Sequence, residues 1–234
     1  MARVYDSEIL PVWSQRFGRM LLRGLTLPPK AIVLDVGCNT GYPSLDLLQR
    51  MEGGRIIAID PIGPLLDIAR QKAGELAGKR IFFRTEAASS KLGFADDVYD
   101  LVVSNLGLLL VDDPAAALQE FARVTKPGGR LIITLPLAGT YAEFFDIYRE
   151  VLTKHDREEV LTRLEGHIAQ LPDPERVVGW LQAAGLIEVE PEREEFHLLF
   201  RSSREFFFSP VIECGPLPAW KDLAGKGEEM QQVF

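Results

Sequence analysis

The feature that most constrains the fold of this chain is an alternation of short apolar runs with longer amphipathic segments. Five apolar runs have the length of strands: 31–37, 55–60, 80–85, 99–105 and 130–136. Their apolar residues are nearly continuous rather than alternating, which is typical of strands that are covered on both faces. The segments between them have helical periodicity at 42–51, 63–76 and 114–125.

Strands that alternate with helices through short connections favour right-handed crossovers and parallel pairing. The sequence therefore predicts an α/β fold: a doubly wound, Rossmann-like, mostly parallel sheet with helices on both faces. Sheets of this kind bind their ligands at the carboxyl ends of the strands. Candidate functional residues are therefore sought where the apolar runs end.

The rhythm changes after residue 136. Residues 140–171 have helical periodicity with a break near His155–Asp156, and they predict a helical cap inserted above the ligand end of the sheet. The following segments predict a helix, an edge strand and a serine-capped helix, at 174–186, 187–200 and 202–213. No convincing strand follows residue 213, so either the chain is truncated or its last strand is atypical.

We expect a single domain over residues 1–234, which is long enough to bury a sizeable core. Its expected parts are an N-terminal helical segment, a cofactor-binding core, a helical cap and the C-terminal part of the fold. These parts span residues 1–30, 31–136, 137–172 and 173–234.

The net charge of −8 argues against nucleic acid or an anionic membrane as the main partner, because both attract basic surfaces. The first residues have no signal-peptide core, and the longest apolar stretch, 101–111, is too short to span a bilayer. We therefore expect a cytoplasmic protein. Its oligomeric state stays open.

The segment VLDVGCNTG (33–41) joins the first strand to the next helix. At Gly37 and Gly41 the backbone must approach something closely or adopt a positive φ. Asp60 ends the second strand, where a carboxylate can accept both hydrogen bonds of a ribose diol. The spacing of Asp35 and the glycines differs from the dinucleotide fingerprint, so the pattern indicates another nucleoside-bearing cofactor.

These segments resemble the class I S-adenosylmethionine-dependent methyltransferases of the small-molecule, methyltransferase-11 type, over roughly residues 31–136. The resemblance is carried by DVGCNTG, IIAIDPIGPLLDIAR, FFRTEA, LGFADDVYDLVVSN and FARVTKPGGRLIIT, at 35–41, 56–70, 82–87, 92–105 and 121–134. This sequence departs from the family's pattern at two places: Asn39 replaces the middle glycine of the first motif, and the spacing from Glu86 to Leu92 is longer than usual.

The resemblance implies S-adenosylmethionine as the cofactor. Asp60 would hold the ribose, Pro61 would lie beside the adenine, and Glu86 and Ala87 would read the adenine edge. The full set of cofactor-binding residues that it implies is Asp35, Gly37, Cys38, Asn39, Gly41, Asp60, Pro61, Glu86, Ala87, Asn105 and Leu106.

The sequence identifies no catalytic residue clearly, and no histidine lies in a cluster typical of metal sites. His155 and His167 are weak candidates for a general base because both lie in the expected cap. Four aromatic residues are candidates for a substrate pocket, with packing as an equal or better explanation: Tyr5, Trp13, Tyr141 and Phe145. Phe17 and Leu21 are expected to form a helix face that packs on the sheet.

These features predict in-line methyl transfer to a small molecule or a carrier-bound acyl group. A non-catalytic scaffold or regulatory subunit that binds S-adenosylmethionine is the alternative, supported by Asn39 and by the missing final strand. A nicotinamide-dependent oxidoreductase is disfavoured by the glycine spacing.

Overall fold

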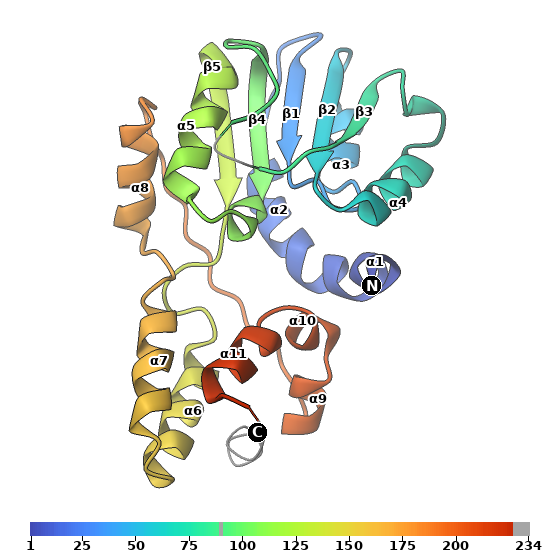
Figure 1. Cartoon of the computed structure of the whole chain (residues 1–234). Coiled ribbons are helices and arrows are strands. Elements are labelled where there is room, and N and C mark those ends of the chain that lie inside the picture. Colours follow the sequence, from blue (N-terminus) through green and yellow to red (C-terminus); the bar gives the residue numbers. More distant parts are fainter. Residues whose placement is uncertain (89–90, 227–234) are drawn as a thin grey trace. The chain divides into compact units, whose positions relative to one another are not determined.

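The computed structural model describes residues 1–88 and 91–226, which form two compact units (Figure 1). The first unit comprises Met1–Leu135 and Val178–Glu190. The second comprises Pro136–Val177 and the chain from Pro191 onward. The helix α8 (Pro174–Ala183) crosses from one unit to the other. Whether the whole chain is the single domain expected from the sequence stays a prediction.

The first unit is built on a parallel sheet of five strands in the order β3-β2-β1-β4-β5. The strands are β1 (Ile32–Val36), β2 (Arg55–Asp60), β3 (Ile81–Thr85), β4 (Tyr99–Asn105) and β5 (Thr125–Thr134). This order reverses direction at β1, because the chain winds outward to β3 and then returns to β4 on the other side. The predicted doubly wound α/β fold is confirmed.

The fifth strand begins earlier than the sequence predicts. β5 starts at Thr125, directly after α5 (Pro114–Val124), and it includes the PGG turn. The pairing of β4 with β5 is irregular between Tyr99 and Leu101, and this shift accommodates the extra residues of the turn. The apolar part that the sequence marks as a strand is the regular part of β5.

Helices bury both faces of the sheet. On one face, Val33, Ile56 and Leu101 pack with residues of α2 (Gln15–Leu22), α3 (Ser44–Arg50) and α4 (Gly63–Ala73). On the other face, Leu34 and Val102 pack with α5 and with the first-unit part of α8. Short 3₁₀ turns follow α4 at Gly74–Leu76 and β4 at Gly107–Leu110. Both faces are therefore covered, as the continuous apolar runs predict.

The N-terminal segment, Met1–Leu22, is helical from Ala2 onward. It runs from α1 (Ala2–Val4) through a π-helix at Tyr5–Ser14 into α2. Phe17 and Leu21 are buried in α2, which confirms the helix face expected to pack on the sheet. Figure 1 shows that the first part of this segment runs past the arrowheads of the strands, at the carboxyl edge of the sheet.

The second unit contains five helices of its own in the described residues: α6 (Ala142–Lys154), α7 (Glu158–Ile168), α9 (Ser203–Phe207), α10 (Pro210–Glu213) and α11 (Leu217–Ala224). The break between α6 and α7 falls at the predicted position. The predicted serine cap is also confirmed, because the amide of Glu205 donates to Ser202 Oγ at 3.2 Å. The unit packs around Trp220, which is fully buried.

The edge strand predicted at 187–200 is wrong. No residue in this range has strand structure, and Ile187 and Leu199 are 83% and 92% exposed. The alternating charges suit an edge strand, but a strand forms only where a neighbour supplies pairing. No described residue after β5 belongs to a strand. In the described part of the chain, no helix is long and apolar enough to cross a membrane.

Candidate cofactor site

The carboxyl ends of β1 and β2 bring the glycine loop and Asp60 together. The amides of Gly37 and Cys38 both donate to the carbonyl of Ile59, at 2.9 and 3.0 Å. The amide of Asn39 then donates to Asp60 Oδ2 at 3.0 Å, and the amide of Ile62 donates to Asp60 Oδ1 at 2.9 Å. The side chain of Asp60 is therefore fixed by the backbone on both sides, and it retains lone pairs on both oxygens.

The loop has the left-handed conformations that its glycines predict. φ is +79° at Gly37 and +99° at Gly41, a region that favours glycine. Asn39, at φ +49°, also lies there, and Asn is among the few other residues that tolerate it. Its side-chain Nδ2 donates to the carbonyl of Gly37 at 2.8 Å, so the residue that replaces the family's middle glycine stabilises the loop.

Gly37 also has a neighbour that the sequence does not reveal. A Cβ atom at Gly37 would lie 3.0 Å from Cα of Gly107, and a Cβ atom at Gly107 would lie 2.6 Å from the carbonyl oxygen of Val36. The glycine loop and the turn after β4 therefore need glycine at both positions to approach each other. The absence of a side chain at Gly37 is required by the protein itself, whatever the ligand.

Asp35 is a fully buried carboxyl group beside this loop. Its Oδ2 accepts a hydrogen bond of 2.6 Å from Ser44 Oγ, whereas its Oδ1 has no hydrogen-bond partner in the described structure. Burial raises the pKa of Asp35 to about 7; the Ser44 hydroxyl opposes this change and the nearby charge of Asp60 adds to it. Burial also raises the pKa of Asp60, against the two amide hydrogen bonds. A cationic ligand group nearby would favour the ionised form of both carboxyl groups and so lower both pKa values.

The predicted adenine-reading residues follow β3. Glu86 Oε1 accepts from the amide of Gly93 at 2.7 Å, and its Oε2 lies 2.9 Å from Arg84 Nε without meeting hydrogen-bond geometry. Ala87 and Pro61 are exposed. The carboxylate of Glu86 thus already has partners within the protein, Gly93 and Arg84. A role for Glu86, Ala87 and Pro61 at the adenine stays a prediction.

The two residues expected to wall the site after β4 lie at the same edge. Asn105 is buried; its Nδ2 donates to the carbonyl of Ser14 at 3.0 Å, and its Oδ1 accepts from Thr134 Oγ1 at 2.7 Å. Leu106 has a φ of +66°, and its amide donates to the carbonyl of Thr134. Asn105 therefore fastens the N-terminal segment to the carboxyl edge.

The N-terminal segment covers the two buried carboxyl groups. The Tyr5 hydroxyl lies 2.8 Å from Ser14 Oγ, and burial raises its pKa to about 12, with the charges of Asp60 and Asp35 acting in the same direction. Asp35 and Asp60 both have 0% exposure. Tyr5 is thus near enough to both carboxylates for their charges to affect its hydroxyl.

A polar latch holds this segment in place. Asp6 Oδ1 accepts from Thr40 Oγ1 in the glycine loop at 2.5 Å and from Lys72 Nζ on α4 at 2.8 Å. Burial raises the pKa of Asp6, but the hydrogen bonds from Lys72 and Thr40 outweigh burial and lower it. Neither Asp6 nor the buried partner Ser44 was identified from the sequence, because contacts 34 and 9 residues apart leave no periodic signal. Only Thr40, the hydrogen-bond partner of Asp6, lies inside the motif that the sequence shows.

Two further candidates for a substrate pocket pack within the core of the second unit. Tyr141 meets Trp220 edge to face at a centroid distance of 5.2 Å, and Phe145, 3% exposed, lies 5.7 Å from the same ring. His155 is exposed at the end of α6. His167 lies 6.2 Å from the ring of Phe145, and burial lowers its pKa. Among the described residues there is no group of acidic, histidine or cysteine side chains that could hold a metal.

Trp13, the remaining aromatic candidate, belongs to the π-helix of the first unit. Its ring lies 5.0 Å from that of Phe17. Within the first unit the structure therefore assembles Asp35, the glycine loop, Asp60, Asn105 and Tyr5 at one edge. The chemistry of this set fits a nucleoside that carries positive charge: a ribose acceptor in Asp60 and an unpartnered buried carboxyl oxygen in Asp35.

Comparison with known proteins agrees with this chemistry. Residues 34–133 match the family described as "Methyltransferase domain". The chain is 31% identical over 197 residues to a demethylmenaquinone methyltransferase of Mycolicibacterium paratuberculosis, covering 80% of this chain and 79% of that protein. It is 30% identical over 202 residues to the protein of the same name from Mycolicibacterium vanbaalenii, covering 81% and 84%.

Two solved structures share the fold. The YcgJ protein of Bacillus subtilis aligns with 94% of this chain and 88% of its own, with a TM-score of 0.63 and 17% identity. The [4+2]-cyclase SpnF aligns with 72% of this chain and 56% of its own, with a TM-score of 0.51 and 25% identity. Proteins with different names therefore share this fold.

Proposed function

The chain belongs to the class I S-adenosylmethionine-dependent methyltransferases, and from this premise we propose that it methylates a small, partly apolar acceptor by in-line transfer. The observation that carries the proposal is the pair of fully buried carboxyl groups, Asp35 and Asp60, at the carboxyl ends of neighbouring strands. Asp60 would accept the ribose hydroxyls. The unpartnered Oδ1 of Asp35 would face the positively charged amino-acid part of the cofactor.

The residues around this pair would fix the cofactor's position. The backbone of Gly37, Asn39 and Gly41 would line its amino-acid side, while Tyr5 and Asn105 would close the edge from the N-terminal segment and from β4. S-adenosylmethionine supplies a methyl group that is already activated on a sulfonium sulfur. The remaining task of the protein is to exclude water and to hold the acceptor in line, and alignment alone can lower a barrier by several kcal/mol.

The acceptor is proposed from two supports. The relatives are named for demethylmenaquinone, which makes this molecule the first acceptor to test. The net charge of −8 disfavours nucleic acid as an acceptor. A carrier-bound acyl group is the second acceptor to test, because the C-terminal segment SSREFFFSPVIE at 202–213 has a weak likeness to enzymes with such substrates.

The entry of the cofactor is part of the proposal. Asp35 and Asp60 have no exposed surface while the N-terminal segment lies over them. We therefore infer that the segment from Met1 to Ser14 moves aside for the cofactor to enter and that the Asp6 latch closes it again. Lids of this kind often set the rate of ligand exchange.

The test is transfer of label from methyl-labelled S-adenosylmethionine to a panel of acceptors: reduced demethylmenaquinone, an acyl group on a carrier protein, and an oligonucleotide. Label in the first acceptor supports the proposal, and the Asp60→Asn variant should transfer less label at a low concentration of S-adenosylmethionine. Binding of S-adenosylmethionine without transfer to any member of the panel would contradict it and favour the non-catalytic scaffold. Transfer to the oligonucleotide alone would also contradict it.

A further inference from the structure

Two adjacent hollows lie beside α2 and α3 and involve none of the residues assigned to the cofactor. The larger, of about 460 Å³, is lined by Gln15, Arg19, Leu22, Arg23, Gly24, Tyr42, Asp46 and Arg50. The smaller, of about 200 Å³, is lined by Leu25, Thr26, Leu27, Pro28, Pro29, Leu47, Arg50 and Glu52. Arg50 borders both, so the hollows are neighbours.

The larger hollow gathers positive charge in an acidic protein. Three of its eight lining residues are arginines, against one acid, Asp46. Arg19 and Arg50 form no ion pair with an acidic side chain of the described chain. Arginine holds phosphate and carboxylate groups through paired N–H donors, so this arrangement suits an anion.

Part of this charge also serves the helices. Arg50 Nη1 donates to the carbonyl of Leu22, the last residue of α2, at 2.8 Å, and a cation at a helix C-terminus is favourable in itself. That bond uses one of the five N–H groups of the guanidinium. Arg50 is therefore held in place by α2 and keeps donors for a ligand.

A glycine inside α2 lets the ring of Tyr42, which lines the larger hollow, pack closely against the helix. A Cβ atom at Gly18 would overlap the ring of Tyr42, with Tyr42 Oη 2.6 Å away. Glycine is unfavourable within a helix, so its presence here permits a close approach of α2 to the start of α3. Burial raises the pKa of Tyr42 to about 12; the charge of Asp46 acts in the same direction, and the charges of Arg19 and Arg50 oppose it.

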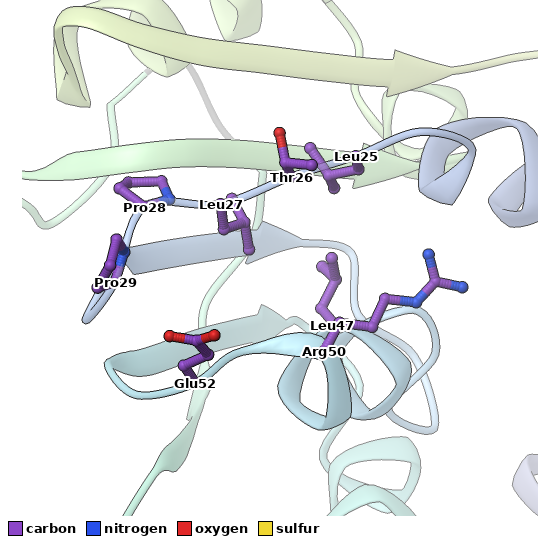
Figure 2. A pocket seen from close by; sticks show the side chains of 8 residues that line it. All are labelled: Leu25, Thr26, Leu27, Pro28, Pro29, Leu47, Arg50 and Glu52. Carbon is purple, nitrogen blue, oxygen red and sulfur yellow. The ribbon is translucent and has the colours of Figure 1, made fainter.

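Five of the eight residues that line the smaller hollow are apolar, and the other three are Thr26, Arg50 and Glu52. Figure 2 shows Leu25, Leu27 and Pro28 on the segment that leads into β1, opposite Leu47 on α3. In the same view Arg50 extends from the end of α3 beside Leu47. An apolar surface next to an arginine-lined hollow is complementary to a molecule with an anionic head and an apolar tail.

We propose that the two hollows form a binding site for an anionic amphiphile, whose phosphate head is held by Arg19 and Arg50 and whose tail lies against Leu25, Leu27 and Pro28. The site is separate from the cofactor edge and does not depend on the acceptor proposed above. A ligand bound there would hold α2 against α3 and would thereby affect the π-helix Tyr5–Ser14, which leads directly into α2.

Calorimetric titration with octyl phosphate, inorganic phosphate and octyl glucoside tests the proposal on the whole protein. Octyl phosphate should bind at least tenfold more tightly than either of the others, because it alone offers both the head and the tail. Equal affinity for octyl phosphate and inorganic phosphate would overturn the proposal. Equal affinity for octyl phosphate and octyl glucoside would overturn it as well.

Variants assign the effect to the hollow. Arg19→Gln with Arg50→Gln should weaken octyl phosphate binding at least tenfold, whereas Arg16→Gln, the same charge change on α2 outside the lining residues, should leave it within twofold. Both variants should bind S-adenosylmethionine as tightly as the unaltered protein. This control shows that the variants fold, and it separates this test from the test of the proposed function. If Leu27→Ser rather than the arginine variants weakens octyl phosphate binding, the arginine-held head is refuted.

Vesicles distinguish a single bound molecule from a membrane surface. The proposal expects no sedimentation of the protein with phosphatidylglycerol vesicles beyond that with phosphatidylcholine vesicles. Sedimentation that Arg16→Gln reduces as much as Arg19→Gln would assign these arginines to general attraction to an anionic surface and would refute the site.

Discussion

At the scale of single residues, Asp60 is the most informative position. Replacing it by Asn keeps the shape and one acceptor oxygen for the loop amides, but removes the charge and one acceptor for the ribose. We expect S-adenosylmethionine affinity to fall by about 1.5–3 kcal/mol, the usual range for hydrogen bonds to a charged group, as measured by calorimetry. Asp67→Asn, on the exposed face of α4 with 74% exposure, is the matched control and should bind normally. Unchanged affinity in Asp60→Asn would remove Asp60 from the site.

Asp35 predicts a pH dependence of binding. Its pKa of about 7 means that the free protein carries much of this carboxyl protonated at neutral pH. A cationic ligand favours the ionised form, so affinity should rise with pH between 5.5 and 7 and then level off, with proton release on binding below pH 7. Titrations in buffers of different ionisation enthalpy measure both effects. Asp35→Asn should abolish the slope, and a flat profile in the unaltered protein would contradict the assignment.

The same shift bears on the stability of the free protein. Because the folded-state pKa of Asp35 lies above its value in the unfolded chain, the protonated carboxyl stabilises the fold at low pH. That contribution is lost as the pH rises from about 4 through 7. Asp35→Asn should lack this part of the pH dependence of the free energy of unfolding, as followed by urea titration.

The histidines are expected to contribute little to the rate. Alignment of a reactive acceptor needs no dedicated base, so His155→Gln and His167→Gln should each lower kcat by less than about tenfold. His155 is exposed, so its replacement should not affect folding. The ring of His167 packs near that of Phe145, so its replacement should destabilise the fold modestly. A loss of a hundredfold or more with unchanged cofactor binding would identify that histidine as the base.

At the scale of elements, the N-terminal segment should control cofactor exchange. Asp6→Asn removes an ion pair with Lys72, in which the side chains are 28% and 35% exposed, and weakens the bond from Thr40. Partly exposed pairs contribute about 0.2–1 kcal/mol, so dissociation of S-adenosylhomocysteine should accelerate by about 1.4- to fivefold in stopped-flow measurements.

Two matched variants test this latch. Glu8→Gln, an exposed residue on the same segment, should leave the rate unchanged. Lys72→Gln should add nothing to Asp6→Asn, because the two residues act as a pair. Additive effects of the two changes would show that the ion pair is not the latch.

The accuracy of the sequence predictions differs among these elements for physical reasons. β1 to β4 were predicted to within a residue or two, because their apolar runs are set by burial on both faces. The π-helix at Tyr5–Ser14 was not predicted, since its hydrogen-bond pattern has no side-chain signature. The strand at 187–200 was predicted wrongly because pairing depends on a neighbour elsewhere in the chain. For the candidate site, the motif predicts Asp35 and Asp60, whereas the contact of Asp6 with Thr40 arises only in the folded protein.

At the scale of the whole molecule, we propose that residues 140–171 act as a mobile helical cap that selects the acceptor. A cap that closes over substrate must open to release product, so its amides should be less protected than those of the sheet. Hydrogen exchange across 140–171 should slow when S-adenosylhomocysteine and an acceptor are both present, and α5 is the internal reference. Equal exchange with and without ligands would instead indicate a fixed structural element.

The burial of Trp220 in the second unit has a spectroscopic consequence. The chain has three tryptophans, and the structure gives each a different environment: Trp13 in the N-terminal segment, Trp180 against the sheet and Trp220 in the aromatic core of the second unit. Trp220 is fully buried, and Phe144 stacks on it with a centroid distance of 4.0 Å. The fluorescence of Trp220 should therefore be blue-shifted and insensitive to added quencher. With Trp180 and Trp220 replaced by Phe, the fluorescence of Trp13 alone becomes an optical reporter of the N-terminal segment as it opens and closes.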